Sequence, residues 1–158
     1  MSAASRLSAA LAQYPRACMA HGPTPVERLA NLSADTGISI SVKRDDCTGI
    51  GLGGNKVRQL EFYLGEAQHN NADTVLITGA VQSNFVRTTA AMAARLGMHC
   101  HVQLEERVDI DNPSYRTSGN VLLNRLLGAT LHSYPAGEDE SGADLALDTL
   151  ATELSASG

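Results

Sequence analysis

The sequence lacks a long apolar run, and this absence argues against a membrane protein. None of the apolar stretches in its 158 residues approaches the ~20 residues that a membrane-spanning helix needs. Residues 1–17 are interrupted by Ser, Gln and Pro, which argues against a secretory signal segment. We therefore expect a cytoplasmic protein.

Clusters of basic residues are also missing. The 12 Lys and Arg residues are scattered singly, and the formal net charge is −5 with an isoelectric point near 5.4. A nucleic-acid-binding surface gathers Lys and Arg because it must neutralise phosphates. The charge distribution therefore argues against a nucleic-acid partner.

Residues that bind metals or form disulfides are few. Cys18, Cys47 and Cys100 are odd in number and far apart, which excludes a disulfide framework and a CxxC metal site. We expect reduced thiols. His99 and His101 share a face of a predicted strand and could bind a metal, but no third ligand has a useful spacing, so we predict none. Loop or surface positions are expected for the other histidines: His21, His69 and His132.

Helix and strand patterns alternate along the chain. Helices are predicted at residues 24–36, 55–68, 83–96, 114–127 and 141–154, and strands at 38–44, 73–79, 98–105 and 129–134. Strands that recur roughly every thirty residues with a helix between them are typical of right-handed βαβ units. We therefore predict an α/β fold, with a parallel sheet flanked by helices in three layers.

The first predicted helix, at residues 24–36, depends on a start signal. Thr24 would be the N-cap, Pro25 the first helical residue and Glu27 the partner in a capping box. Gly37 would end the helix.

Lysine is scarce, so chemistry that needs a lysine has only two candidates, Lys43 and Lys56. Lys43 falls on the polar face of the strand at 38–44, where a solvated side chain is expected. Lys56 follows the glycine-rich stretch "TGIGLGGN" at the start of a predicted helix.

The glycine stretch matches two familiar motifs poorly. Gly49, Gly51 and Gly54 fit G-x-G-x-x-G, but residues 44–48 separate them from the strand and no acid ends the next strand, so a dinucleotide site is disfavoured. A P-loop fails because valine follows Lys56.

The helix start gives Lys56 two possible roles. The positive end of the helix dipole disfavours a cation there, which suits a lysine that must be neutral to attack a carbonyl. The alternative is an ordinary surface lysine that tolerates the dipole.

A second group of polar residues follows the strand at 73–79. Gln82, Ser83 and Asn84 open a helix, where free backbone N–H groups can bind a carboxylate or phosphate. This position also lies at the carboxyl edge of a parallel sheet, where ligands of α/β proteins bind. The alternative is that Ser83 or Asn84 is only an N-cap.

Together, "KRDDCTGIGLGGNKVRQLEF" and "TGAVQSNFVRTTAAMAARLGMHC" resemble the family of D-cysteine desulfhydrases and 1-aminocyclopropane-1-carboxylate deaminases. These are pyridoxal-phosphate enzymes with a fold of the tryptophan-synthase-β type. The resemblance runs from near "PTPVERL" through "YRTSGNVLLNRLLGA" to the end of the chain. It implies the cofactor pyridoxal 5′-phosphate and a lyase or deaminase acting on a small amino acid.

The resemblance also implies roles for single residues. Lys56 matches the family's G-G-N-K lysine, which carries the cofactor covalently, and Asn55 precedes it. Asn84 would bind the cofactor's phenolic oxygen. The substrate carboxylate would be received at Gln82, Ser83 and Asn84, chiefly by the serine and neighbouring backbone N–H groups. In the deaminase branch Ser83 would also handle protons.

Members of this family are considerably longer, so the resemblance covers only their N-terminal half. It implies that residues 1–45 are an arm of a large domain and that residues 46–158 form a small α/β domain. The family's cofactor-phosphate loop and the partner of the pyridine nitrogen would lie outside this chain. We therefore expect an incomplete site here, and a homodimer at full length.

Several functions remain open from the sequence. Within the family, D-cysteine desulfhydrase is favoured over L-cysteate sulfo-lyase and 1-aminocyclopropane-1-carboxylate deaminase. Outside it, the chain could be a non-catalytic domain that binds a carboxylate or phosphate, or an inactive interaction module. Loop-shaping hydrogen bonds are expected of Asp45 and Asp46, because adjacent residues in an extended segment point in opposite directions. Structural contacts are expected of Tyr115 and Asn120.

Overall fold

The computed structural model describes residues 2–157. Its helices are α1 (Ala3–Leu11), α2 (Ala30–Thr36), α3 (Lys56–His69), α4 (Asn84–Leu96), α5 (Gly119–Leu126) and α6 (Glu140–Ser157). Its strands are β1 (Val26–Arg28), β2 (Ser41–Lys43), β3 (Thr74–Ala80), β4 (His99–Glu105) and β5 (Thr130–Tyr134). Short 3-10 turns lie at Asp45–Thr48 (η1), Ile50–Leu52 (η2) and Pro113–Arg116 (η3). Among the described helices, none is both long and apolar enough to cross a membrane.

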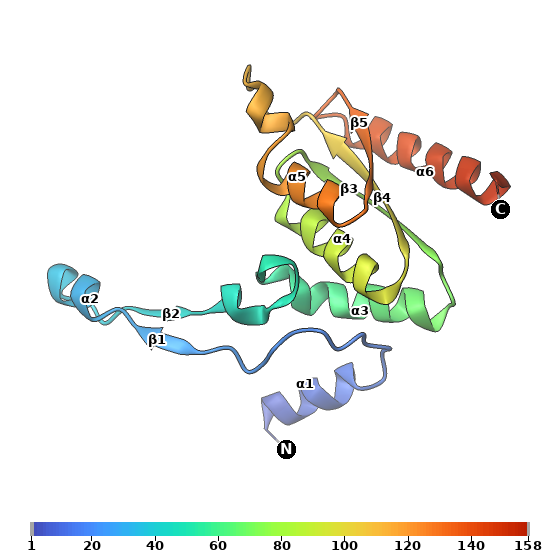
Figure 1. The fold of residues 1–158 in the computed structure, drawn as a ribbon. Coiled ribbons are helices and arrows are strands. Elements are labelled where there is room, and N and C mark those ends of the chain that lie inside the picture. Colours follow the sequence, from blue (N-terminus) through green and yellow to red (C-terminus); the bar gives the residue numbers. More distant parts are fainter. Residues whose placement is uncertain (1, 158) are drawn as a thin grey trace.

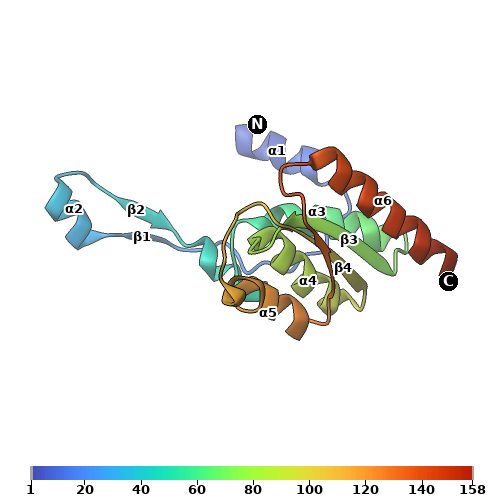
Figure 2. The ribbon, with the colours of Figure 1, turned by 90° about the horizontal axis from the view of Figure 1, so that it is seen from above.

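A parallel sheet forms the centre of the molecule, with strand order β3-β4-β5. The helices α4 and α5 cover one face, and α6 crosses the other face near β3 (Figures 1 and 2). Gln103 on β4 donates a hydrogen bond of 2.8 Å to the carbonyl of Ala143, which attaches α6 to the sheet. The predicted α/β fold with a parallel sheet between helical layers is confirmed.

The apolar core lies between the sheet, α3 and α4. Val57, Leu60 and Leu64 recur at helical spacing, so they form one buried face of α3. The central strand β4 is the most deeply buried because it has a neighbour on both edges, and Val102 is fully buried. The core thereby fixes the ends of α3 and α4 relative to the carboxyl edge of the sheet.

The helix predicted at residues 24–36 is wrong in its first half. The segment begins as strand β1, which pairs antiparallel with β2, and the helix comprises only Ala30–Thr36. Glu27 does not close a capping box, because its carboxylate accepts two hydrogen bonds from Arg44, of 2.7 and 2.8 Å. Gly37 ends the helix as predicted, in the left-handed conformation at φ 69°.

Tertiary partners explain why Thr24 does not cap a helix. Its side-chain oxygen lies 2.5 Å from the Lys43 Nζ and 3.3 Å from the Arg58 Nη2, and its hydroxyl faces Asp45. These charged partners come from other elements, so the local capping pattern cannot reveal them. Lys43 is exposed on its strand, as expected, and its amine in addition donates to both the hydroxyl and the carbonyl of Thr24.

The single helix predicted at residues 114–127 is divided into η3 and α5. Gly119 has a φ of 57°, and a Cβ there would lie 2.6 Å from the Oε1 of Gln82. The Gln82 side chain fills the break: it donates to the carbonyl of Tyr115 at 2.6 Å and accepts from the backbone N–H of Asn120 at 2.8 Å. A residue of the predicted site therefore interrupts the helix.

The strands β1 and β2 and the helix α2 form an arm. Figures 1 and 2 both show this arm extending away from the sheet and its helices. Several of its apolar side chains are exposed, including Val26 and Ile38.

Candidate functional site

The glycine loop (residues 48–54) folds back tightly before α3. Its backbone adopts left-handed conformations at successive residues, and at Gly53, with φ 72°, a Cβ would lie 2.0 Å from the carbonyl oxygen of Asp46. Only glycine fits there. The buried Thr48 hydroxyl donates to the carbonyls of Asp45 and Gly54, at 3.0 and 3.1 Å. The loop is therefore fixed by its own hydrogen bonds.

The two acidic residues before the loop shape it, as predicted. Asp45 accepts two hydrogen bonds from Arg58 on α3, of 2.7 and 2.8 Å, and this guanidinium lowers the pKa of the Asp45 carboxyl. Asp46 pairs with Arg44 at 2.6 Å. The two carboxylates have separate arginine partners, which fits a structural role and not a catalytic pair.

The loop delivers Lys56 to the first position of α3. Asn55 is the N-cap residue and makes no side-chain capping bond. The Lys56 side chain is half-buried, and its amine has no hydrogen bond or ion pair within the described part of the chain. The other lysine, Lys43, is bound to Thr24. Lys56 is thus the lysine with an amine available for chemistry.

The helix α4 begins at the predicted Q-S-N segment (Gln82, Ser83 and Asn84). Ser83 is the N-cap, and its Oγ accepts from the N–H of Val86 at a long 3.4 Å. The first backbone N–H groups of a helix have no carbonyl partner within the helix and face outward. Ser83 therefore does cap the helix, and its weak capping bond leaves the half-buried hydroxyl able to bind a ligand.

The side-chain amide of Gln82 is hydrogen-bonded to the segment that opens α5. Besides its bonds to Tyr115 and Asn120, its Nε2 lies 3.1 Å from the carbonyl of Ser118. These contacts use both ends of its amide. They confirm the structural contacts expected of Tyr115 and Asn120. Substrate binding by the Gln82 side chain stays a prediction.

Asn84 occupies the first turn of α4, and its side-chain oxygen is hydrogen-bonded twice. Oδ1 accepts from Asn120 Nδ2 at 3.1 Å and from Arg87 Nη2 at 3.4 Å. Its Nδ2 group has no partner among residues 2–157. The side chain therefore offers a free donor.

Arg87 joins the glycine loop to this helix start. Its Nη2 also lies 3.4 Å from the carbonyl oxygen of Gly53, and only 6% of the residue is exposed. Burial lowers the pKa of its guanidinium. The loop that carries Lys56 and the helix that carries Asn84 are thus held against each other. Sequence reasoning missed Arg87, because α4 carries two arginines and only the structure shows that Arg87 is buried whereas Arg95 is exposed.

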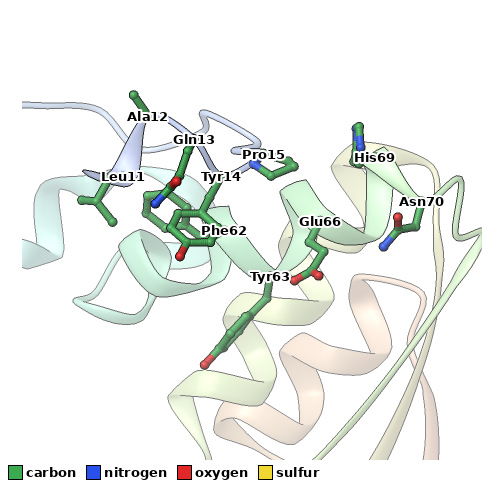
Figure 3. Close-up of a pocket in the computed structure, with 10 residues that line it drawn as sticks. All are labelled: Leu11, Ala12, Gln13, Tyr14, Pro15, Phe62, Tyr63, Glu66, His69 and Asn70. Atoms are coloured by element: carbon green, nitrogen blue, oxygen red, sulfur yellow. The ribbon is translucent and has the colours of Figure 1, made fainter. Parts of the chain in front are cut away.

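A sizeable hollow lies away from these residues. A cavity of about 680 Å³ is lined by residues 11–15 and the second half of α3, with Phe62, Tyr63 and Glu66 at its wall (Figure 3). None of the predicted site residues lines it.

A histidine pair lies on the sheet face that α6 partly covers. His132 was expected in a loop or on the surface, but it is half-buried on β5, with its Nε2 3.1 Å from the Nδ1 of His101. Their rings stack at 5.4 Å. Within the described residues, no group of three or more His, Cys, Asp or Glu is arranged to hold a metal.

Comparisons with solved structures agree with this geometry. A structure titled "Crystal Structure Analysis of the ACC deaminase homologue" superposes with a TM-score of 0.84 at 34% identity, covering 100% of this chain and 46% of the other. O-ureido-L-serine synthase superposes with a TM-score of 0.63 at 22% identity, over 84% of this chain, and shares the fold.

Comparisons of sequence lead to the same group of proteins. D-cysteine desulfhydrase of Serratia proteamaculans (strain 568) is 45% identical over 148 residues, which is 94% of this chain and 44% of the relative. D-cysteine desulfhydrase of Salmonella paratyphi B is 44% identical over the same length. The chain thus spans less than half the length of these curated relatives. Residues 17–157 match the family model described as "Pyridoxal-phosphate dependent enzyme". With that match over most of its length, the chain belongs to the family of pyridoxal-phosphate-dependent enzymes.

Proposed function

We propose that this chain is part of a D-cysteine desulfhydrase, a lyase that eliminates sulfide from D-cysteine and yields pyruvate and ammonia. One observation carries the proposal: the free Lys56 amine lies at the end of a glycine loop that Arg87 joins to the Q-S-N helix start. The 45% identity to a D-cysteine desulfhydrase supports this choice of substrate.

The residues present fit pyridoxal phosphate. Lys56 supplies an amine without a protein partner for covalent attachment. Asn84 supplies a free N–H donor for the phenolic oxygen of the ring. Asn55, between the glycines and the lysine, belongs to the same cofactor-binding segment. When bound, the cofactor supplies an electron sink that stabilises negative charge on the carbon next to the substrate amino group.

The chain's own residues would perform the remaining steps. Lys56 would move a proton at the substrate carbon through its Nζ. Ser83 and the N–H groups of the first turn of α4 would receive the substrate carboxylate, because a helix N-terminus favours an anion. Holding the carboxylate would orient the bond to be broken toward Lys56.

The same proposal includes the division of the chain between two domains and the oligomeric state of the full-length enzyme. Residues 1–45 would be an arm of the large domain, and residues 46–158 would form the small domain. The exposed apolar side chains of the arm support this division, because they need a covering surface. A homodimer in the cytoplasm is proposed for the full-length enzyme.

Substrate choice is tested by product release. The full-length protein would be assayed with D-cysteine for sulfide, L-cysteate for sulfite and 1-aminocyclopropane-1-carboxylate for 2-oxobutanoate. We expect sulfide. Release of 2-oxobutanoate would favour the deaminase, a second candidate that the 34% identity to the deaminase homologue supports and in which Ser83 would handle protons. Sulfite would indicate L-cysteate sulfo-lyase.

Borohydride reduction separates an enzyme from a non-catalytic carboxylate- or phosphate-binding domain. Reduction of the cofactor-loaded full-length protein would leave a pyridoxyl adduct on the peptide that contains Lys56, seen by mass spectrometry. Lys56→Arg should lose the adduct and Lys43→Arg should keep it. Absence of the adduct from the unmodified protein would support a binding role or an inactive module.

A further inference from the structure

The amide of Asn84 has a definite orientation, because an arginine can only donate hydrogen bonds. Arg87 Nη2 lies 3.4 Å from one end of the Asn84 amide. A guanidinium carries five N–H donors and no acceptor. The amide atom that faces Arg87 is therefore the oxygen, and the NH₂ group lies on the other side.

Asn120 gives a second, independent reason for the same orientation. Its own amide is fixed because Nδ2 lies 2.8 Å from the backbone carbonyl of Gln82, which can only accept. The same Nδ2 lies 3.1 Å from the Oδ1 of Asn84. Asn120 therefore also donates to that oxygen, and turning either amide over would bring two acceptors or two donors together.

Arg87 occupies a site that disfavours it. It is 6% exposed, its Nη1 has no hydrogen-bond partner in the described part of the chain, and it forms no ion pair there. Burying a cation without a counter-charge is costly. A leucine or methionine would fill this position without that cost, so the donors of Arg87 serve a purpose.

We propose that Arg87 and Asn120 are positioning residues that hold the oxygen of Asn84 and so present its NH₂ group to the pyridoxal ring. The phenolic oxygen of that ring accepts hydrogen bonds, so it needs a donor. Because Arg87 also bonds Gly53, the same side chain fixes the loop that carries Lys56. This inference rests on the proposed function, since it takes the pyridoxal ring as the group that Asn84 meets.

The test uses the full-length protein with Arg87→Met and Asn120→Asp. In Asn120→Asp a carboxylate faces the Asn84 amide, which favours the reversed orientation. Three quantities would be measured: pyridoxal-phosphate affinity, the pH at which the absorbance of the bound cofactor titrates, and thermal unfolding of the cofactor-free protein. Arg95→Met is the control, because Arg95 lies exposed on the same helix.

We expect both variants to bind the cofactor about tenfold more weakly, the effect of losing one hydrogen bond. The pH at which the absorbance of the bound cofactor titrates should rise in both variants. Without the Asn84 donor the phenolic oxygen keeps more negative charge, so the proton beside it is held more firmly. Arg95→Met should change neither quantity. In an Asn84→Ala background, Arg87→Met should produce no further titration shift, since Arg87 would act through Asn84.

Two results would overturn the inference. Folded Arg87→Met and Asn120→Asp proteins that titrate at the pH of the unmodified protein would show a merely structural role, whatever their melting temperatures. In the cofactor-free protein, Asn120→Asp should move the side-chain amide NMR signals of Asn84, and unmoved signals would also refute it. This second readout distinguishes the two proposals, because unmodified protein that takes up no cofactor would refute the proposed function.

Discussion

Two lysines of this chain have amines in opposite surroundings. Lys43 Nζ lies 2.5 Å from the Thr24 hydroxyl, whereas Lys56 has no such partner in residues 2–157. Sequence pattern alone left Lys56 open between a surface role and a catalytic one. The structure adds that its loop is held rigidly by glycine geometry and by Thr48. A rigid loop favours a reactive amine, because the nucleophile must be positioned.

The three cysteines should differ in reactivity. Burial raises the pKa of the Cys100 thiol to about 11, whereas Cys18 and Cys47 are exposed. Because the thiolate is the reactive form, an alkylating reagent at pH 8 should modify Cys18 and Cys47 and spare Cys100 in the folded protein. Peptide mass spectrometry would measure this. Labelling in guanidinium is the control, and equal labelling of all three in the folded state would contradict the prediction.

At the level of elements, Glu61 attaches the N-terminal segment to α3. One carboxylate oxygen accepts from the N–H groups of Met19 and Ala20, both at 2.6 Å, and the other from Arg16. Glu61 is 1% exposed. Burial raises the pKa of this carboxyl, but these donors outweigh burial, so its pKa is lowered below the usual value of 4.5.

Replacing Glu61 by Gln should lower the free energy of unfolding by about 1–3 kcal/mol, the usual cost of weakening buried hydrogen bonds to a charged group. Because its folded pKa is lowered, the carboxylate's contribution is complete above the usual value and is lost as the pH falls through the folded pKa. Urea unfolding between pH 7 and pH 3 would show a smaller acid loss in Glu61→Gln. Glu66 is exposed on the same helix, so Glu66→Gln should lose as much stability in acid as the unmodified protein. If Glu61→Gln also lost as much stability as the unmodified protein between pH 7 and pH 3, the prediction would be contradicted.

A second prediction at the level of elements concerns how stability depends on pH through His101 on β4 and His132 on β5. Burial, and then the neighbouring His132 and His99, lower the pKa of His101 below 6.5. A lowered histidine pKa disfavours the charged form in the folded state, so stability is full above pH ~6.5 and falls as the pH drops toward the folded pKa. His101→Gln should lose less stability between pH 7.5 and pH 5 than the unmodified protein. His69→Gln is the exposed control, and equal losses in all three would refute the prediction.

Helices and strands could be predicted where periodicity and capping residues within the same segment decide them. The helices and strands between residues 55 and 105 lie where periodicity and glycine caps placed them, because one buried face decides each of them. The arm was not predictable, since β1 pairs with β2 through Val26 and Lys43, which are far apart in sequence. The break before α5 was missed for the same reason, as it depends on Gln82.

At the scale of the whole molecule, the chain spans 44% of the D-cysteine desulfhydrase that it matches. We predict that the 158 residues alone bind pyridoxal phosphate much more weakly than the full-length protein, because the resemblance places the phosphate loop outside them. Absorbance titration of the isolated chain against the full-length protein would measure this. A clear band of lysine-bound cofactor in the isolated chain would refute it.

The candidate site was only partly visible in the sequence. Lys56, Ser83 and Asn84 could be named because each lies beside a glycine or cap pattern that marks a helix start. Arg87 and the orienting role of Asn120 could not, because their significance lies in contacts with Gly53 and Asn84 across elements. A buried arginine that forms no ion pair among the described residues is recognisable only when burial is known.

The sequence by itself determined the α/β class, the family resemblance and the two helix starts, because periodicity, glycine positions and motif spacing are local properties of the chain. Only the tertiary structure decided which amine is free, which way the Asn84 amide points and why Gln82 is committed to α5. These depend on donors and acceptors that folding brings together from distant positions. Burial then makes each pairing specific, since an unpaired polar group inside the molecule is costly.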